Sequence, residues 1–385
     1  MKSFNLIILY ACAILITIVM YSPQPLQPYF EQLLGISKVK ASLFTTSILI
    51  PLSFSSILYG YLLEKLPIKK VLVIAFFILA ISEVVFASVS NYYALISMRI
   101  VQGFMAPAVM TGILSYISYS AHKQVARAVG IYIGMTIVGG FVGRMLSGIC
   151  TDLFGWRTFF YLQAIVLFIM SYVLYKMLSD IEINFIKPKL KHMIKIWSIR
   201  RNRYIFTAIF CLFFVFQATL NILPFELKNI SGVFSGSKTG FMYAGYIVGV
   251  FLSFNISRIV AFTKTPLNAV SIGFIIYIIS LQFLRMENFY TIFLSMVVFY
   301  FGGFLIHTVA TSHINKSATS HKAITNGLYI SSYYFGGALG SFLPSFIYNR
   351  FGWNVLLTAL SVVLCLALLL TLRLRHLENT KFRMP

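Results

Sequence analysis

Apolar segments of about 20 residues recur along the chain, separated by short polar connections. Each is long enough to cross a bilayer as a helix, and the alternating pattern of about ten residues that marks a membrane strand is missing. Because backbone groups find no water in lipid, we expect every segment to be helical. The twelve predicted spans are 5–27, 41–63, 71–89, 92–115, 126–150, 158–178, 204–227, 238–262, 266–285, 288–311, 323–347 and 353–373.

The longest polar stretch, residues 179–203, divides the spans into two groups of six and is rich in lysine and arginine. We therefore expect a six-helix bundle over 1–178, a basic cytoplasmic linker over 179–203 and a second six-helix bundle over 204–373. A cytoplasmic tail over 374–385 would follow.

Two stretches of the chain, residues 130–157 and 327–354, match each other without a gap at a separation of 197 positions. Several glycines coincide, and the run from Phe154 to Trp156 falls on the run from Phe351 to Trp353. Hydrophobic composition alone seldom produces such a match, so the chain consists of two related halves. With six spans in each, the halves would be parallel repeats about an axis along the membrane normal.

Composition supports the membrane assignment. Of 385 residues 59% are hydrophobic and 10% charged, with a mean hydropathy of +0.86, which is more apolar surface than a soluble protein of this length can bury. The four cysteines are scattered among apolar neighbours, which argues against disulfides and metal ligands. The first apolar run lacks a small-residue cleavage site, so we interpret it as a span rather than a signal peptide.

The formal net charge of +22 reflects orientation in the membrane rather than nucleic-acid binding. Of the 31 lysines and arginines, 22 lie in the termini and the connections on their side, seven lie in the opposite connections, and two lie inside spans. This bias places both termini in the cytoplasm and predicts a multi-pass protein of the cell inner membrane.

The connection after the second span combines a carboxylate with several cations in a tight turn. Ion pairs there can bridge neighbouring helix ends in one conformation and break in another. The alternative is that these residues only fix topology. The predicted conformational latch consists of Gly60, Glu64, Lys65, Lys69 and Lys70.

The fourth span carries Arg99, followed three positions later by Gln102. An arginine inside a span is costly unless it is paired or hydrated, so it is a functional candidate. Glu83, in the third span, lies at a similar depth, about 10 Å from the outer helix ends at 1.5 Å per residue. A pair of Glu83 and Arg99 would serve charge coupling, or it would be purely structural.

The fifth span has small residues on one face, which permit close helix packing or a gating movement. Generic packing is the alternative explanation. The predicted gating helix is marked by Gly130, Gly139, Gly143 and Gly148. The same segment carries Arg144 and Asp152, which we predict to take part in proton or charge coupling, whereas the second half has Ser341 and Asn349 at the matching positions.

These motifs resemble those of the major facilitator superfamily. The turn after the second span is similar to its loop motif, with Glu64, Lys65 and Pro67 in place of aspartate, arginine and glycine. The run from Arg99 to Gly103 is similar to its Arg-x-x-Gln-Gly element, and the fifth-span glycines to its antiporter motif, in which proline stands where this chain has Arg144.

The run from Tyr21 to Leu26 is similar to the Tyr-x-x-Gln-Pro-Leu of a YnfM-like efflux branch of that superfamily. The resemblance covers nearly the whole chain. It implies an all-α major facilitator fold of twelve transmembrane helices in two pseudo-repeat bundles. It also implies a central cavity that opens alternately to each side, driven by the proton gradient.

Aromatic and amide side chains inside the spans would suit an amphipathic organic substrate. Tyrosines also gather at membrane interfaces or simply pack, and a lone histidine is more often a helix–helix hydrogen bond. The predicted substrate cavity consists of Tyr21, Gln24, Gln102, Gln217, Asn221, Tyr243, Tyr246, His307, Tyr329 and Tyr333.

The sequence therefore predicts a monomeric, proton-coupled antiporter that exports a small organic molecule: a drug-like compound, a metabolite, a sugar or a siderophore. It would use protons and the lipid bilayer but no cofactor. Proton-coupled uptake by the same fold is the main alternative, and a channel is a further one. An integral-membrane enzyme is a third, but the nine acidic residues are scattered and no phosphate-binding loop is present.

Overall fold

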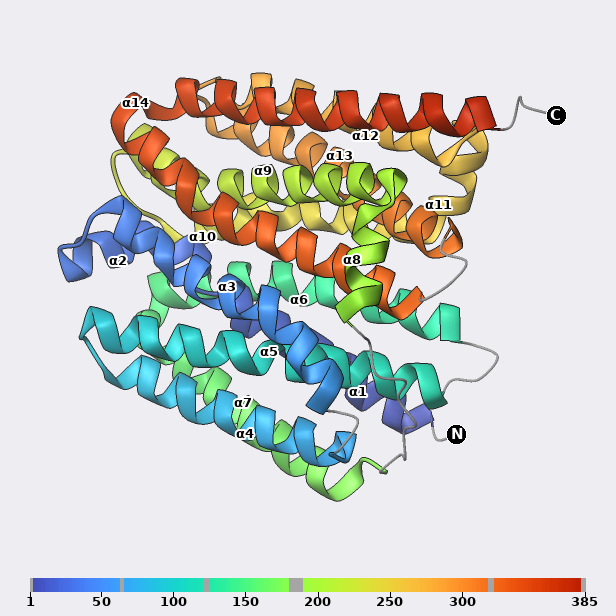
Figure 1. Ribbon diagram of the computed structural model, residues 1–385. Coiled ribbons are helices and arrows are strands. Elements are labelled where there is room, and N and C mark those ends of the chain that lie inside the picture. The colour runs from blue at the N-terminus through green and yellow to red at the C-terminus, as the bar shows by residue number, and fades with distance from the viewer. Residues whose placement is uncertain (1–2, 63–65, 121–124, 180–189, 318–321, 382–385) are drawn as a thin grey trace. The chain divides into compact units, whose positions relative to one another are not determined.

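The computed structural model describes residues 3–62, 66–120, 125–179, 190–317 and 322–381, and all regular structure in them is helical. Figure 1 labels the α-helices. The elements are α1 (Ser3–Tyr21), η1 (Gln24–Leu26), α2 (Gln27–Leu34), α3 (Lys38–Leu62), α4 (Ile68–Ser88), α5 (Tyr92–Ser120), α6 (Val125–Phe154), α7 (Trp156–Met177), α8 (Leu190–Ser198), α9 (Arg200–Ser231), α10 (Gly236–Phe241), η3 (Met242–Gly245), α11 (Tyr246–Phe262), α12 (Pro266–Phe283), α13 (Phe289–Ser317) and α14 (Lys322–Lys381).

Within these residues, nine helical stretches are long and apolar enough to cross a membrane. The longest of them contains two predicted spans, because α14 folds back on itself at Gly352, where φ is 79° (Figure 1). The helices occupy the positions of the predicted spans, which confirms the all-α membrane fold.

The chain forms two compact units. Unit 1 consists of Met1–Lys187 together with Leu227–Ala244, and unit 2 of Pro188–Glu226 together with Gly245–Pro385. The predicted boundary lay at the basic linker, residues 179–203. Helix α8 lies within that stretch, and Leu227–Ala244, from the second half of the sequence, belongs to unit 1.

In unit 1, α1 packs on α6, α3 on α5, and α4 on both α5 and α7. The ends of these helices meet in an aromatic core, in which the Phe30 ring lies 4.7 Å from that of Phe44 and 5.1 Å from that of Trp156. Phe30 belongs to the short helix α2, so this core fixes α2 to the longer helices. In unit 2, α12 packs on α13 and α14, and α11 on α13.

The first predicted span ends earlier than its hydrophobicity suggests. Helix α1 stops at Tyr21, and Pro23, Pro25 and Pro28 follow within the next seven residues. Proline has no backbone N–H to continue a helix, so the chain turns into η1 and α2. This turn places Gln24 at a buried position beside α6.

Glycines permit the closest helix contacts in each unit. A Cβ atom on Gly143 of α6 would lie 2.8 Å from the Ile18 Cα atom of α1, and one on Gly139 would meet the Ile14 carbonyl oxygen. In unit 2, Gly336 and Gly340 of α14 lie equally close to the α9 backbone. The shared glycines of the repeat therefore hold α6 on α1 and α14 on α9.

Candidate functional site

The buried guanidinium of Arg144 is the centre of a polar cluster in unit 1. Its Nε donates a hydrogen bond of 2.7 Å to Gln24 Oε1, and its Nη1 donates one of 2.7 Å to the Gly140 carbonyl oxygen. The guanidinium carbon lies 4.1 Å from the ring centroid of Tyr21 and 5.0 Å from that of Tyr243. Three predicted cavity residues, Tyr21, Gln24 and Tyr243, thus surround a predicted coupling residue.

The elements that form this cluster come from distant parts of the sequence. Helix α6 supplies Arg144, the proline-rich turn supplies Gln24, and η3 supplies Tyr243. Ser147, one turn after Arg144, donates a hydrogen bond of 2.7 Å to the Ser22 carbonyl oxygen. This bond fixes the turn against α6 and keeps the Gln24 amide within reach of the guanidinium. Arginine between two tyrosine rings is stabilised by cation–π attraction.

Asp152, near the end of α6, binds the start of α10. Its carboxylate accepts hydrogen bonds from the backbone N–H of Gly236 (2.9 Å) and of Ser237 (2.8 Å), and from the Ser235 hydroxyl (3.2 Å). A carboxylate at a helix N-terminus satisfies free N–H groups and interacts favourably with the helix dipole. Asp152 and Arg144 are therefore on one helix but in separate clusters.

Arg99 is buried and ties α5 to two neighbouring helices. Its Nη1 and Nη2 donate to the carbonyl oxygens of Val19 and Met20 on α1 (2.8 and 2.6 Å), and its Nε donates to that of Phe44 on α3 (2.9 Å). Its Nη1 also donates to Gln102 Oε1 at 2.5 Å. Gln102 therefore faces Arg99, and this contact fixes the orientation of its amide.

Glu83 lies near this group without a direct bond to it. Its neighbour Ser82 accepts a hydrogen bond of 3.1 Å from Gln102 Nε2, so α4 meets the Arg99 group at this level. Both carboxyl oxygens are buried, and among the described residues neither has a hydrogen-bond partner. Arg99 thus donates its hydrogen bonds to backbone oxygens and to the Gln102 side chain rather than to Glu83.

In unit 2, three of the predicted residues form an aromatic group. The Tyr333 ring stacks on Phe213, with centroids 3.7 Å apart, and lies 4.6 Å from the His307 ring. The Tyr329 hydroxyl lies 3.4 Å from His307 Nδ1 and 2.9 Å from the Thr311 hydroxyl. His307, Tyr329 and Tyr333 are thus brought together, whereas sequence reasoning missed Phe213 because it looks like any other apolar residue of α9.

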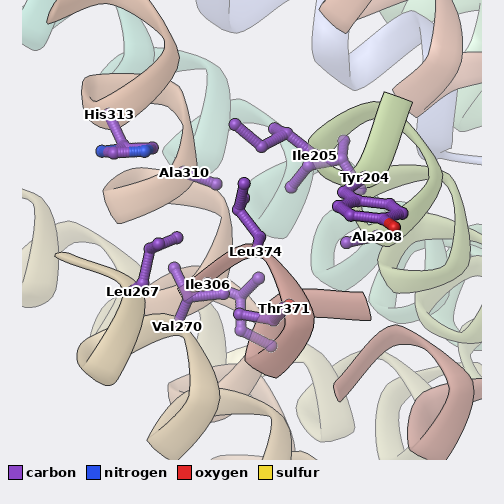
Figure 2. Close-up of a pocket in the computed structure, with 11 residues that line it drawn as sticks. Tyr204, Ile205, Ala208, Leu267, Val270, Ile306, Ala310, His313, Thr371 and Leu374 are labelled. Carbon is purple, nitrogen blue, oxygen red and sulfur yellow. The ribbon is translucent and has the colours of Figure 1, made fainter. Parts of the chain in front are cut away.

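The other predicted residues of unit 2 are buried in helix packing. Asn221 Nδ2 donates a hydrogen bond of 2.8 Å to the Ser341 carbonyl oxygen. Gln217 lies beside Gly337, and the Tyr246 ring is 4.7 Å from that of Tyr300. Unit 2 also holds a cavity of about 20 Å³ lined mainly by apolar residues of α9, α12, α13 and α14 (Figure 2). It is too small for an organic substrate, and none of the predicted cavity residues lines it.

The predicted latch is described only in part. Gly60 lies in α3, and Lys69 and Lys70 lie in the first turn of α4. Glu64 and Lys65 are outside the described residues. The gating glycines divide into two kinds: Gly139, Gly143 and Gly148 make close contacts, whereas a Cβ atom on Gly130 would meet nothing within 4 Å.

Many long apolar helices with a polar cluster buried among them are typical of a multi-pass membrane protein. The chain belongs to the Major Facilitator Superfamily, whose family model matches residues 9–268. Members of this superfamily are transporters rather than enzymes and generally need no cofactor.

Named relatives agree with this assignment. The inner membrane transport protein YnfM of Escherichia coli (strain K12) is 25% identical, covering 93% of this chain and 87% of its own. A transporter of Buchnera aphidicola subsp. Schizaphis graminum is 24% identical, covering 93% and 88%.

Solved structures share the fold. The nucleoside transporter NupG superposes with a TM-score of 0.79 at 15% identity, covering 95% of this chain and 99% of that one. A bacterial homologue of the human lysosomal transporter Spinster, in an inward-facing and occupied conformation, gives a TM-score of 0.76 at 14% identity, covering 97% of each chain.

Proposed function

We propose that this transporter exports a small organic molecule from the cell by proton-coupled antiport, through alternating access of its two halves. It would act as a monomer in the inner membrane, with both termini in the cytoplasm. The observation that carries the proposal is the buried cluster of Arg144, Gln24, Tyr21 and Tyr243 in unit 1. A charged group among membrane helices is costly, and proteins keep one there mainly for transport or coupling.

Glu83 is the proposed proton carrier. An ionised carboxylate with no hydrogen bond is costly in a buried site, and binding a proton removes that charge. The positive charge of Arg99 nearby favours the return to the ionised form. Glu83 can therefore alternate between two protonation states, which coupling to a proton gradient requires.

The proposed substrate is an amphipathic molecule with a flat ring or apolar body. The stacked group of Phe213, Tyr333 and His307 in unit 2 supports an aromatic contact with such a molecule. We place drug-like compounds and metabolites before sugars and siderophores, because ligand sites are lined mainly by hydrophobic and aromatic side chains with a few polar groups.

A fluorescent cationic dye tests export directly. Cells that make the protein should accumulate less dye than cells without it, and an uncoupler should remove the difference. Arg144→Ala should abolish the effect while the protein still inserts into the membrane at the normal level. Higher dye levels in producing cells would indicate uptake. Unchanged levels would rule out a multidrug exporter, and comparison of the metabolites in the medium would then decide whether a specific metabolite is exported.

Glu83→Gln tests the coupling step, with Glu287→Gln as the control because Glu287 is an exposed carboxylate. The Glu83 variant should lose the stimulation of transport by a proton gradient, whereas the Glu287 variant should keep it. Unchanged proton dependence in Glu83→Gln would contradict the coupling role.

A further inference from the structure

Helices α4 and α7 lie side by side in unit 1 (Figure 1). Near one end of the pair, the Ser88 and Tyr161 hydroxyl oxygens are 3.0 Å apart. Toward the other end, Ser171 Oγ donates a hydrogen bond of 2.9 Å to the Val73 carbonyl oxygen. Residue numbers therefore rise along α4 as they fall along α7, so the two helices are antiparallel.

An aromatic contact sets the register of this pair. The buried rings of Phe86 on α4 and Phe160 on α7 have their centroids 4.8 Å apart. Glu83 lies three residues before Phe86, and Gln163 lies three residues after Phe160. Residues three apart share a helix face, so in antiparallel helices Glu83 and Gln163 face each other one turn away from the aromatic contact. The Ser171 bond agrees with this register, because it lies eight residues beyond Gln163 and its partner on α4 lies ten residues before Glu83.

Both side chains are buried and have polar atoms without hydrogen bonds. Glu83 is 1% exposed and Gln163 is 6% exposed, whereas Leu162 and Ile165 beside Gln163 on α7 are exposed. Among the described residues, the two Glu83 carboxyl oxygens and the Gln163 Oε1 and Nε2 atoms have no hydrogen-bond partner. A buried polar atom without a partner is costly. Each side chain is thus the nearest available partner of the other, within reach by rotation of its χ angles.

The charged residues of the surrounding helices leave this place to Gln163. Arg99 of α5 directs its hydrogen bonds to backbone oxygens and to Gln102. Arg157, at the start of α7, donates to Ser90 Oγ at 2.7 Å, and Lys176 lies in the last turn of α7.

The remaining ionisable groups near this level also point elsewhere. Tyr161 of α7 is 40% exposed and pairs with Ser88. Lys69 and Lys70, the other charged residues of α4, lie in its first turn. Gln163 is therefore the polar residue that α7 presents to Glu83.

An amide side chain can bind a carboxyl group in either of its protonation states. A neutral Glu83 would donate its O–H to Gln163 Oε1, and an ionised Glu83 would accept from Gln163 Nε2. Gln163 itself neither takes up nor releases the proton. An apolar side chain at position 163 would satisfy neither state.

We propose that Gln163 is the positioning residue of Glu83, and that its amide binds the Glu83 carboxyl group both with and without the proton. The proposal rests on the proton-carrier role given to Glu83 above. The repeat supports it, because at the separation of 197 positions Glu83 falls on Ser280 and Gln163 falls on Leu360. The half that lacks the carboxylate therefore also lacks the amide.

Infrared difference spectroscopy of the full-length protein in lipid bilayers tests the pairing without any substrate. Spectra at low and high pH show the C=O stretching band of each carboxyl group that takes up a proton, and the band of Glu83 is the one that Glu83→Gln removes. Gln163→Met keeps the length of the side chain but has no amide. It should move the Glu83 band to the higher frequency of an acid without hydrogen bonds.

Ser171→Ala is the matched control. It removes a hydrogen bond between the same two helices, about 12 Å from Gln163 along α7, and should leave the Glu83 band in place. If Gln163→Met does not fold, Gln163→Asn withdraws the amide by one methylene and should move the band in the same direction. An unchanged band in the variant that folds would overturn the proposal.

The same spectra separate this proposal from the transport proposal. A shifted band in a protein that transports nothing would uphold the pairing of Gln163 with Glu83 and refute the proposed function. Proton-coupled export together with an unshifted band would do the reverse. If no Glu83 band formed at any pH, Glu83 would not be the proton carrier, and the role of Gln163 would be refuted with it.

Discussion

The two repeated stretches, residues 130–157 in α6 and α7 and residues 327–354 in α14, differ most at one position. Arg144 in the first donates to the Gln24 side chain and lies between two tyrosine rings. Its counterpart, Ser341, donates within its own helix to the Ala338 carbonyl oxygen, and its own carbonyl oxygen accepts from Asn221. Both positions thus meet an amide side chain of another element, but only the first brings a charge.

The surrounding glycines are used in the same way by both repeats. Gly143 packs on α1 and Gly340 on α9, and Gly155 and Gly352 both form turns with positive φ, at 84° and 79°. Positions that both repeats share therefore build the scaffold. Two of the positions at which they differ, 144 against 341 and 152 against 349, carry in the first repeat the charges that we assign to transport.

The largest expected effect tests the shared scaffold. Gly143→Leu and Gly340→Leu should each abolish folded protein, because a side chain would collide with the backbone of the facing helix. Gly130→Ala and Gly327→Ala are the matched controls, since a Cβ atom there would meet nothing within 4 Å. Folded yield after membrane extraction is the measurement. If one Leu variant folded normally, the two repeats would not share this packing.

Substitution of Arg99 measures how much a buried charge stabilises the first half at a position where the second half has an apolar residue. Arg99 falls on Met296 in the second half, and both residues are buried. Arg99→Met should lower stability by about 3 kcal/mol or more, because several carbonyl oxygens lose a charged donor. Met296→Leu is the control and should cost less than about 1.5 kcal/mol. Unfolding of the purified proteins measures both, and equal losses would show that the hydrogen bonds of Arg99 stabilise nothing.

The turn glycines should show equal effects in the two halves. Gly155→Ala and Gly352→Ala each force alanine into a backbone region that is essentially restricted to glycine, at a cost of about 1–3 kcal/mol. No neighbouring atom opposes the added methyl group at either position, so backbone strain alone decides the result. Thermal unfolding should shift by similar amounts. A shift in only one variant would mean that the two turns are not equivalent.

The smallest expected effect is a difference in stability between substitutions at the two tryptophans that follow these glycines. Trp353 Nε1 donates a hydrogen bond of 2.8 Å to the Leu284 carbonyl oxygen, whereas Trp156 Nε1 has no partner among the described residues. Trp353→Phe should therefore cost about 1 kcal/mol more than Trp156→Phe. The same unfolding assay measures the difference, and a larger loss for Trp156→Phe would contradict it.

The fold could be predicted because a long apolar segment in lipid must satisfy its own backbone hydrogen bonds, which a helix does. The internal repeat indicated that the chain has two related halves. The positions at which helices break were harder to predict from the sequence. Prolines ended α1 at Tyr21, six residues before the predicted end at residue 27. The predicted span 238–262 is divided among α10, η3 and α11, which follow one another from Gly236. The assignment of Leu227–Ala244 to unit 1 depends on tertiary contacts, which leave no local pattern.

The sequence indicated most of the polar residues but few of their partners. Intramembrane charge alone singled out Arg99 and Arg144. Arg144 and Gln24 are 120 positions apart in the sequence, so no local pattern indicates their contact. Asp152 binds backbone N–H groups, and because every residue except proline has one, the sequence cannot show which of them it binds. Depth counting placed Glu83 near Arg99, but it could not show that backbone oxygens take the hydrogen bonds of Arg99.

The central claim is that transport depends on Arg144 and Asp152, whose counterparts in the second repeat carry no charge. The most direct test gives the first repeat the residues of the second, in the double variant Arg144→Ser and Asp152→Asn. Its control is the matched double variant Ser341→Ala and Asn349→Ala, and transport is compared at equal amounts of membrane-inserted protein. We predict that the first variant retains less than about a tenth of transport, as expected when charged hydrogen bonds are lost, and that the second retains most of it. An equal loss in both variants would contradict the claim.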